Sequence, residues 1–488
     1  MGCCAKPWFP RSGFLLLVLS GLDTPGCATL EPMGDPATFE DLRLEETTFR
    51  FVAVDYEERS GEVAFTYAFD ESITLVERLS FPVPDSPLPP ERRRALQRAL
   101  FLLSLVAGIS YYKAAVPPVA RIESGTVTED EIAFLERLYF EGLGEFAYVN
   151  GLRLQNRPRF EYTLARERNI ERVDLDRRSL VAVGGGKDSC VSVETLRSGN
   201  EPMLLASVNG ARPILDVVGA SGLDFVQVRR MISPELLHLN TIGALNGHVP
   251  ITAIVSLVLS ATALITGCDA VVMSNERSAS SGNLDWEGRM VNHQYSKSLD
   301  AERGLAELIR NSVTPDLAYF SLLRPLSELE IARRFAQMDH YHFSFTSCNR
   351  PFGISPAKES SSNNWCCDCP KCRFVFLALA PFLPPQKLQS IFGFNMLDDR
   401  RQEGGFDALI GWNAHKPFEC VGEVEESLAA LTLLSQRPEW QGHWIVKRFQ
   451  NDIFPRLTLP HDLTTKPFQP SRDHDVPQHF FELLNATS

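Results

Sequence analysis

The residues best suited to chemistry form the turn VGGGKDS at positions 183–189. Its three glycines let backbone amides come close to an anion, and the flanking residues predict a strand before the turn and a helix after it. The helix N-terminus adds partial positive charge at this point. The spacing is neither that of a Walker A loop nor that of a dinucleotide-binding turn. Strand, glycine turn and helix start together still suggest a phosphate site, and the order Gly-Gly-Lys-Asp-Ser requires another explanation.

A cysteine cluster is the second group with clear chemical potential. Of the eleven cysteines, three lie in the first 32 residues and four lie within CCDCPKC at 366–372. Cys366, Cys369 and Cys372 have C-x₂-C-x₂-C spacing, and Cys348 lies 18 residues upstream. Four thiolates at this spacing suit a tetrahedral structural Zn²⁺; free reactive thiols and plain buried cysteines are the alternatives. If zinc takes these four, Cys367 is left over.

The elements that must position both groups alternate between strand and helix from residue 179 onward. Strands are expected at 179–186, 202–210, 223–230 and 268–276, with the sheet continuing through 316–336 and 343–349. This alternation predicts an α/β fold with a doubly wound, mainly parallel sheet covered on both faces. Residues 248–267 are apolar enough to suggest a membrane span. Their marginal length and recurring Ser and Thr predict a buried core helix instead.

The region before this sheet predicts an α+β amino-terminal domain. Alternating apolar residues at 47–81, interrupted at Ser60-Gly61, predict an antiparallel hairpin or meander. Helical patterns follow at 91–107 and 128–140, the second with Thr126 or Thr128 as its N-cap. The 488 residues thus divide into four parts: leader-like residues 1–32, this domain at 33–170, an α/β domain at 171–400 and a small carboxy-terminal segment at 401–488.

The charge balance limits the partners. The formal net charge is −13. Proteins that grip tRNA or DNA over a wide surface use many Lys and Arg contacts to phosphates, so no nucleic-acid partner is expected, and no membrane partner either. A local basic pocket for one small anion remains compatible with this charge.

The turn resembles the SGGxDS signature of the PP-loop ATP pyrophosphatases, which cleave ATP to AMP and diphosphate on a doubly wound sheet. Gly184 stands where that family usually has Ser, so one hydroxyl donor is missing. The resemblance also places SVNG (207–210) and SNERSAS (274–280) at the ends of later strands, where ligands of open α/β sheets bind. The nucleotide-binding residues it implies are Gly184, Gly185, Gly186, Lys187, Asp188, Ser189, Ser207, Asn209, Asn275, Glu276 and Arg277. Lys187 would neutralise charge on the phosphates, and Asp188 would be a ligand for Mg²⁺.

The chain from about Met33 onward resembles a narrower family. The segments VAVGGGKDS, LNGHVPITAIVS, SNERSAS, CCDCPKCRFVF and HKPFECVGEVEES are similar to those of the MurL family, the UDP-N-acetylmuramoyl-L-alanyl-L-glutamate epimerases. The resemblance implies an isomerase that uses ATP and Mg²⁺ to invert the terminal L-glutamate of UDP-MurNAc-L-Ala-L-Glu through an acyl-adenylate. AMP and diphosphate are released during peptidoglycan precursor synthesis. It also implies a functional link to a MurD-type ligase.

The residue that moves the α-proton is left open by the sequence. The candidates are Cys367, Cys420, His415, Lys358 and Glu276, and a pair of thiols is one option. Two rival functions also remain. One is a PP-loop ligase or synthase of the deazaguanine or tRNA-thiolation type, whose deazaguanine members have a similar four-cysteine zinc site. The other is a regulator that binds a nucleotide without cleaving it.

The first 32 residues differ in composition from the rest. Basic residues followed by a short apolar run look like a signal peptide. An upstream start codon wrongly chosen would give the same pattern, with Met33 as the true start. We expect the second explanation and a cytoplasmic protein, because the implied chemistry requires ATP.

Overall fold

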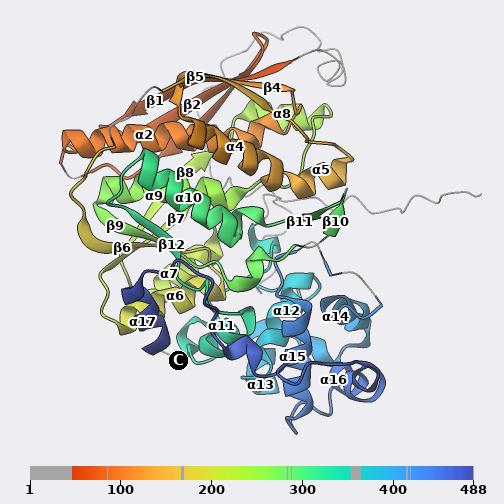
Figure 1. Cartoon of the computed structure of the whole chain (residues 1–488). Coiled ribbons are helices and arrows are strands. Elements are labelled where there is room, and N and C mark those ends of the chain that lie inside the picture. Colours follow the sequence, from red (N-terminus) through yellow and green to blue (C-terminus); the bar gives the residue numbers. More distant parts are fainter. Residues whose placement is uncertain are drawn as a thin grey trace, which may run out of the picture.

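The computed structural model describes residues 47–486 apart from 85, 166–169, 283, 287, 353–363, 414, 415 and 418. The leader-like residues 1–32 and two candidate proton carriers, Lys358 and His415, lie outside this part. A ten-stranded sheet of order β12-β9-β6-β7-β8-β3-β2-β1-β4-β5 runs through the described chain. Figure 1 shows the amino-terminal elements at the top, the central strands below them and the carboxy-terminal helices at the bottom.

The amino-terminal half of the sheet begins as an antiparallel meander, as the alternating pattern predicts. β1, β2 and β3 pair in order, and Gly61 has φ +72° in the first turn. β4 and β5 extend the sheet in parallel beside β1. The N-cap of α4 is Thr128, which forms a capping box with Glu131. The strands and helices of this half are β1 (Thr48–Glu57), β2 (Glu62–Phe69), β3 (Ile73–Ser80), α2 (Pro90–Ala107), α3 (Ile109–Tyr112), β4 (Val119–Val127), α4 (Glu129–Gly142), α5 (Gly144–Asn150) and β5 (Arg159–Leu164).

The other half of the sheet is parallel, as the alternation of strand and helix predicts. β8 also pairs antiparallel with β3, which joins the two halves into one sheet. The elements of this half are β6 (Asp176–Ala182), α6 (Lys187–Ser198), β7 (Met203–Val208), α7 (Arg212–Ser221), β8 (Phe225–Met231), α8 (Pro234–Thr241), α9 (Ile251–Thr266), β9 (Cys268–Met273), α10 (Leu299–Ser312), β12 (Ala318–Ser321) and α11 (Glu328–Phe335).

Two hydrophobic cores cover the two faces of the parallel strands. Adjacent residues of β6 point to opposite sides, so Leu180 belongs to the core that contains α2 and α9, and Val181 to the core that contains α6 and α11. A sheet covered on both faces is the α/β arrangement expected from the sequence. The carboxyl ends of its strands are then free to carry a site.

The two most apolar helices are core helices. α9 is buried along most of its length, which confirms the interpretation of residues 248–267. The continuous helical stretch Pro90–Tyr112 is long and apolar enough to cross a membrane, but 89% of its apolar window is buried inside the protein. Its apolar side chains therefore pack in the protein core.

The prediction that the sheet continues through residues 343–349 is wrong. This segment forms a turn and irregular backbone, and Phe345 and Cys348 are fully buried. The backbone amide of Thr346 donates to the carbonyl of Gly185 at 2.9 Å. The apolar run is thus explained by packing against the glycine turn and not by strand pairing.

The remaining chain is mainly helical and packs below the sheet (Figure 1). α17 returns to lie against α6. The elements are the hairpin β10 (Leu284–Trp286) and β11 (Arg289–Val291), the 3₁₀ turns η1 (Arg277–Ser280) and η2 (Tyr295–Lys297), and the helices α12 (Pro370–Leu379), α13 (Pro385–Phe392), α14 (Glu403–Leu409), α15 (Val424–Ser435), α16 (Trp444–Arg448) and α17 (Gln478–Ala486).

Candidate active site

The glycine turn lies between the end of β6 and the start of α6, as predicted. Gly185 has φ +80°, and a Cβ there would come within 3.1 Å of the backbone of Pro213 and Ile214. This position therefore requires glycine. Gly184 borders open space, so the serine usual in PP-loop proteins would fit, and its absence has no steric cause. Gly186 is the N-cap of α6 and has no side chain to cap the helix, which leaves the first-turn amides suited to an anion.

Lys187 is buried at the start of α6 between two carboxylates. Its ammonium lies 2.5 Å from Asp188 Oδ1 and also contacts Glu328 at the start of α11. Burial lowers the pKa of Lys187, but the two carboxylates outweigh burial and raise it above its ordinary value. The side chain is therefore a fixed cation beside the glycine turn.

More carboxylates than cations gather at this point. Burial raises the pKa of Glu328 well above its ordinary value, and Asp188, Glu276 and Glu426 raise it further against the effect of Lys187. The Asp188 side chain keeps 30% of its surface exposed. An excess of carboxylates with one accessible member suits a divalent cation that prefers oxygen ligands, so the site fits Mg²⁺ with Asp188 as a ligand.

The other predicted nucleotide-binding residues lie at the ends of neighbouring strands. Ser207 donates to the carbonyl of Asn209 at 2.9 Å, and the Asn209 side-chain oxygen accepts from the amide of Arg230 at 2.8 Å. Asn275 donates to Ser321 at 3.0 Å. Arg277 donates to the carbonyl of Gln469 at 3.2 Å. These contacts fix the shape of the strand ends next to the turn.

Cys420, one of the candidate proton carriers, lies between a lysine and a histidine. Its sulfur is 3.5 Å from Lys297 Nζ and 3.5 Å from His293 Nε2. Burial raises the pKa of the Cys420 thiol, but Lys297 and Lys371 outweigh burial and lower it below its ordinary value. Cys420 in turn raises the pKa of Lys297, so this pair favours a thiolate beside an ammonium. Thiolates are good proton acceptors.

A second histidine and a carboxyl group continue the row from His293. The ring centres of His293 and His248 are 6.4 Å apart, and His248 Nδ1 is 3.6 Å from Glu145 Oε2. Burial lowers the pKa of both histidines to about 3, so both rings are neutral. Burial raises the pKa of Glu145 to about 7, helped by the charges of Cys420 and Glu419.

Arg324 connects the turn region to the thiol. Its guanidinium is fully buried and pairs with Glu302 at 2.7 Å. It also donates to the carbonyls of Glu276 and Lys297, each at 2.6 Å. The carboxylates of Glu276 and Asp188 both raise the pKa of Lys297. The predicted phosphate site and the Cys420 cluster are therefore parts of one electrostatic unit.

The four cysteines of the predicted zinc site converge. The sulfur atoms of Cys348, Cys366, Cys369 and Cys372 all lie within 4.8 Å of one another. Cys372 is 3.6 Å from Cys366 and 3.4 Å from Cys369. A tetrahedral site with Zn–S bonds of about 2.3 Å has S···S edges of about 3.8 Å, so the four thiols lie close to the geometry of a Zn²⁺ site.

The Cys367 side chain bonds to a group outside the four-cysteine cluster. Its thiol donates to the carbonyl of Phe392 at 3.3 Å. Burial, together with the charges of Cys366 and Cys348, raises its pKa to about 11. This environment favours the neutral thiol and is unlike that of Cys420.

Sequence reasoning missed most of the residues around Cys420. Lys297, His293 and Glu145 carry no motif, and Glu328 and Arg324 lie in a segment expected only to continue the sheet. His248 lies in LNGHVP, which helped to identify the family but gave no role to the histidine. Together with Cys420, these residues come from five separate segments, so only the fold brings them together.

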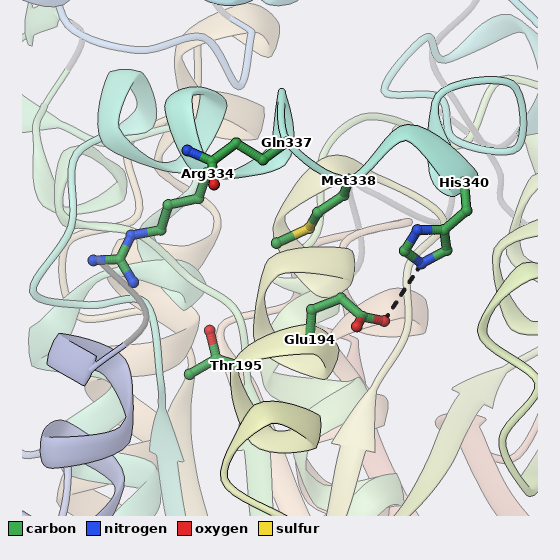
Figure 2. Close-up of a pocket in the computed structure, with 6 residues that line it drawn as sticks. All are labelled: Glu194, Thr195, Arg334, Gln337, Met338 and His340. Atoms are coloured by element: carbon green, nitrogen blue, oxygen red, sulfur yellow. Dashed lines mark ion pairs between the residues drawn. The ribbon is translucent and has the colours of Figure 1, made fainter.

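A cavity of about 270 Å³ lies further along α6 and does not belong to this group. Figure 2 shows Glu194 of α6 in an ion pair with His340 across it. The remaining lining residues are Thr195, Arg334, Gln337, Met338. None of the predicted nucleotide, metal or proton-transfer residues lines it.

Fold and site together define an α/β protein with a glycine turn suited to an anion beside a charged thiol cluster. Comparison with known proteins specifies this class. Residues 41–322 match the model of the MurL N-terminal domain, and residues 344–462 match that of the MurL C-terminal domain. The chain belongs to the MurL family.

Curated relatives support this membership over almost the whole chain. A protein of Xanthomonas oryzae pv. oryzae (strain MAFF 311018) is 44% identical over 441 residues, covering 90% of this chain and 97% of the relative. Proteins of Salinispora tropica and a Micromonospora species are each 42% identical, covering 92% and 91% of this chain and 97% and 98% of the relatives. All three are named UDP-N-acetyl-alpha-D-muramoyl-L-alanyl-L-glutamate epimerase.

Proposed function

We propose that this protein inverts the terminal L-glutamate of UDP-MurNAc-L-Ala-L-Glu to D-glutamate in an ATP-dependent reaction of peptidoglycan precursor synthesis. The observation that carries this proposal is identity of 42–44% to three epimerases of that name over about nine tenths of the chain. A MurD-type ligase that adds L-glutamate would supply the substrate. The requirement for ATP is consistent with a reaction in the cytoplasm.

The need for ATP follows from the acidity of the α-proton. Next to a free carboxylate this proton is a very weak acid, because the carbanion would form beside a negative charge. Adenylation of the carboxylate removes that charge and releases diphosphate. The carbanion can then delocalise onto the acyl oxygen, as it does in a thioester. Hydrolysis to AMP afterwards makes the inversion irreversible.

The residues of the glycine turn suit the adenylation step. The amides of Gly185, Gly186 and the first turn of α6 would hold the phosphates, and Lys187 would stabilise the charge that develops on them. Asp188 would bind Mg²⁺, which supplies positive charge at the phosphate oxygens. The excess of carboxylates around Lys187 supports this assignment, because a divalent cation would offset it.

The four-cysteine cluster suits one structural Zn²⁺ per chain. It connects the segment at 346–348, which contacts the glycine turn through Thr346, to the start of α12 at Pro370. Zinc bound there would fix the position of that segment against the turn. Its contribution would be to folding and not to the reaction.

A product assay tests the proposed function. The full chain is incubated with ATP, Mg²⁺ and UDP-MurNAc-L-Ala-L-Glu, and the AMP formed is measured. The glutamate released by acid hydrolysis of the product is then separated into its L and D enantiomers. We expect D-glutamate and AMP to form together, and neither with UDP-MurNAc-L-Ala. AMP that forms only with a deazaguanine precursor or tRNA would support a synthase instead. If no AMP forms with any acceptor tested, the chain is not an enzyme of this class.

A further inference from the structure

Inversion requires one group that removes the α-proton and another that returns a proton on the opposite face. A deprotonated base and a protonated acid must therefore coexist near neutral pH. The row Cys420, His293, His248 and Glu145 contains one group of each kind at its two ends. Its contacts are 3.5 Å from sulfur to His293, 6.4 Å between the ring centres and 3.6 Å from His248 to Glu145.

We propose that Cys420 accepts the α-proton as a thiolate and that Glu145, acting through His248, supplies the proton that returns to the carbon. This inference rests on the proposed epimerisation and assigns its two proton-transfer groups. A thiol at one end and a carboxyl group at the other replace the pair of thiols considered from the sequence.

Three observations favour Cys420 as the base over its neighbours. Lys297 is held in its charged form by the thiolate and nearby carboxylates, so it has no lone pair to accept a proton. The two histidines are neutral, but desolvation strongly disfavours protonation of their rings. Cys367 is bonded to the carbonyl of Phe392 and favours the thiol. Cys420 alone among these five combines a contacting ammonium with a lowered pKa.

Glu145 has the properties expected of the acid. Only 6% of its surface is exposed, and its Oε2 atom makes no hydrogen bond within the described part of the chain. A buried, unbonded carboxyl oxygen is costly unless it has another role. The ring of His248 in front of it keeps 24% of its side chain exposed, which allows contact with a substrate. A neutral imidazole can donate the proton on one ring nitrogen while its other ring nitrogen accepts a proton, so the ring remains neutral overall.

Other charged groups face the row and set its balance. The cations that act on it are Lys297, Lys371, Lys416 and Lys113, and the anions that act on it include Glu276 and Glu419. The cations lie mainly toward Cys420 and favour its ionised form. Glu419 and the thiolate act on Glu145 and favour its neutral form.

Protons and electrons balance over the two steps. In the first, the Cα–H bond of the glutamyl adenylate breaks, an S–H bond forms on Cys420, and the electron pair moves to the acyl oxygen to give an enolate. In the second, the pair returns to Cα, which takes the proton from His248 Nε2 while the Glu145 hydroxyl passes its proton to Nδ1. Cys420 then loses a proton to solvent and the His248–Glu145 pair regains one, which restores the site.

Isotope exchange in D₂O tests each end of the row separately. With Cys420→Ala, we expect ATP-dependent AMP formation to continue while inversion and α-deuterium incorporation both fall by at least about 100-fold. With Glu145→Gln, deuterium should still enter the recovered L-glutamate, whereas D-glutamate should fall by at least about 100-fold. His248→Asn should give the same signature as Glu145→Gln and covers the case in which one variant fails to fold.

The matched controls are Cys268→Ser and Glu141→Gln. Cys268 is a buried cysteine at the start of β9, and Glu141 lies near the end of helix α4, where it pairs with Arg289 of β11. Both should invert at close to the wild-type rate. Inversion by Cys420→Ala at the wild-type rate would overturn the assignment of the base. Equal losses of exchange and inversion in Glu145→Gln and His248→Asn would overturn the assignment of the acid. Failure of the wild-type chain to form AMP would instead contradict the proposed function.

Discussion

Replacing Lys187 with methionine should affect both stability and catalysis. The buried ammonium is 2.5 Å from Asp188 and also contacts Glu328. Methionine fills a similar space without the charge, so the variant leaves two carboxylates without their cation. Removing one partner of a buried ion pair typically costs about 3–5 kcal/mol of unfolding free energy. We expect a loss of this size at pH 8, measured by urea unfolding.

The loss should depend on pH in a defined direction. In Lys187→Met, burial and the neighbouring carboxylates still raise the pKa of Glu328, and the cation that opposed them is gone. A carboxyl group whose folded-state pKa is raised destabilises the folded protein when it is ionised. Stability should therefore recover as the pH falls toward 5, where Glu328 binds a proton.

The double variant Lys187→Met with Glu328→Gln separates the two roles of the lysine. It removes the unpaired buried charge, so it should recover at least about half of the lost stability at pH 8. AMP formation should stay at least about 100-fold below wild type in both variants, because neither restores a cation beside the phosphates. If the single variant unfolds within about 0.5 kcal/mol of wild type, the lysine does not balance the buried carboxylates. If it forms AMP at the wild-type rate, the lysine does not act on the phosphates.

Three further predictions test other parts of the site. Asp188→Ala should lose AMP formation, measured with saturating Mg²⁺, while its thermal unfolding stays close to wild type, because this side chain is 30% exposed. Elemental analysis should find about one zinc per chain. Cys369→Ser should lower the zinc content and soluble yield more than the activity per folded molecule. Protein free of zinc with four titratable native thiols would contradict this prediction. Glu145→Gln should unfold at higher urea than wild type at pH 8, by up to about 3 kcal/mol, because the pKa of Glu145 is raised to about 7 and its ionised form is costly; the difference should vanish below about pH 4.5.

The sequence predicted local features well because each is encoded in neighbouring residues. The glycine turn, the helix after it and the C-x₂-C-x₂-C spacing depend on short patterns of residue type and periodicity. α9 could be assigned to the core because its Ser and Thr residues and its position between strands argue against a membrane span. In the same way, the turn at Gly61 follows from a glycine between two alternating runs.

The prediction was wrong or silent where tertiary contacts decide. The apolar segment at 343–349 resembles a strand, but the backbone bond from Thr346 to Gly185 and the burial of Cys348 give it another conformation. Periodicity cannot show that β8 and β3 pair, because that antiparallel contact joins segments more than a hundred residues apart. Glu145, the proposed proton donor, owes its raised pKa mainly to burial. Burial depends on the whole fold, so a sequence pattern does not reveal this pKa.

Arg324 would give a structural reason for the proposed adenylation and proton transfer to occur in one place. An enolate formed from an acyl-adenylate must be reprotonated before hydrolysis releases it, so the two sets of groups have to keep a fixed separation. The buried guanidinium holds the carbonyl of Glu276, at the end of β9, and that of Lys297, which faces the thiol. Its charge is balanced by Glu302, so it can serve as a rigid connection without attracting the substrate. The segment after β9 beside the glycine turn and the lysine beside Cys420 thus share Arg324 as a hydrogen-bond donor, so a displacement of one would strain the contact with the other.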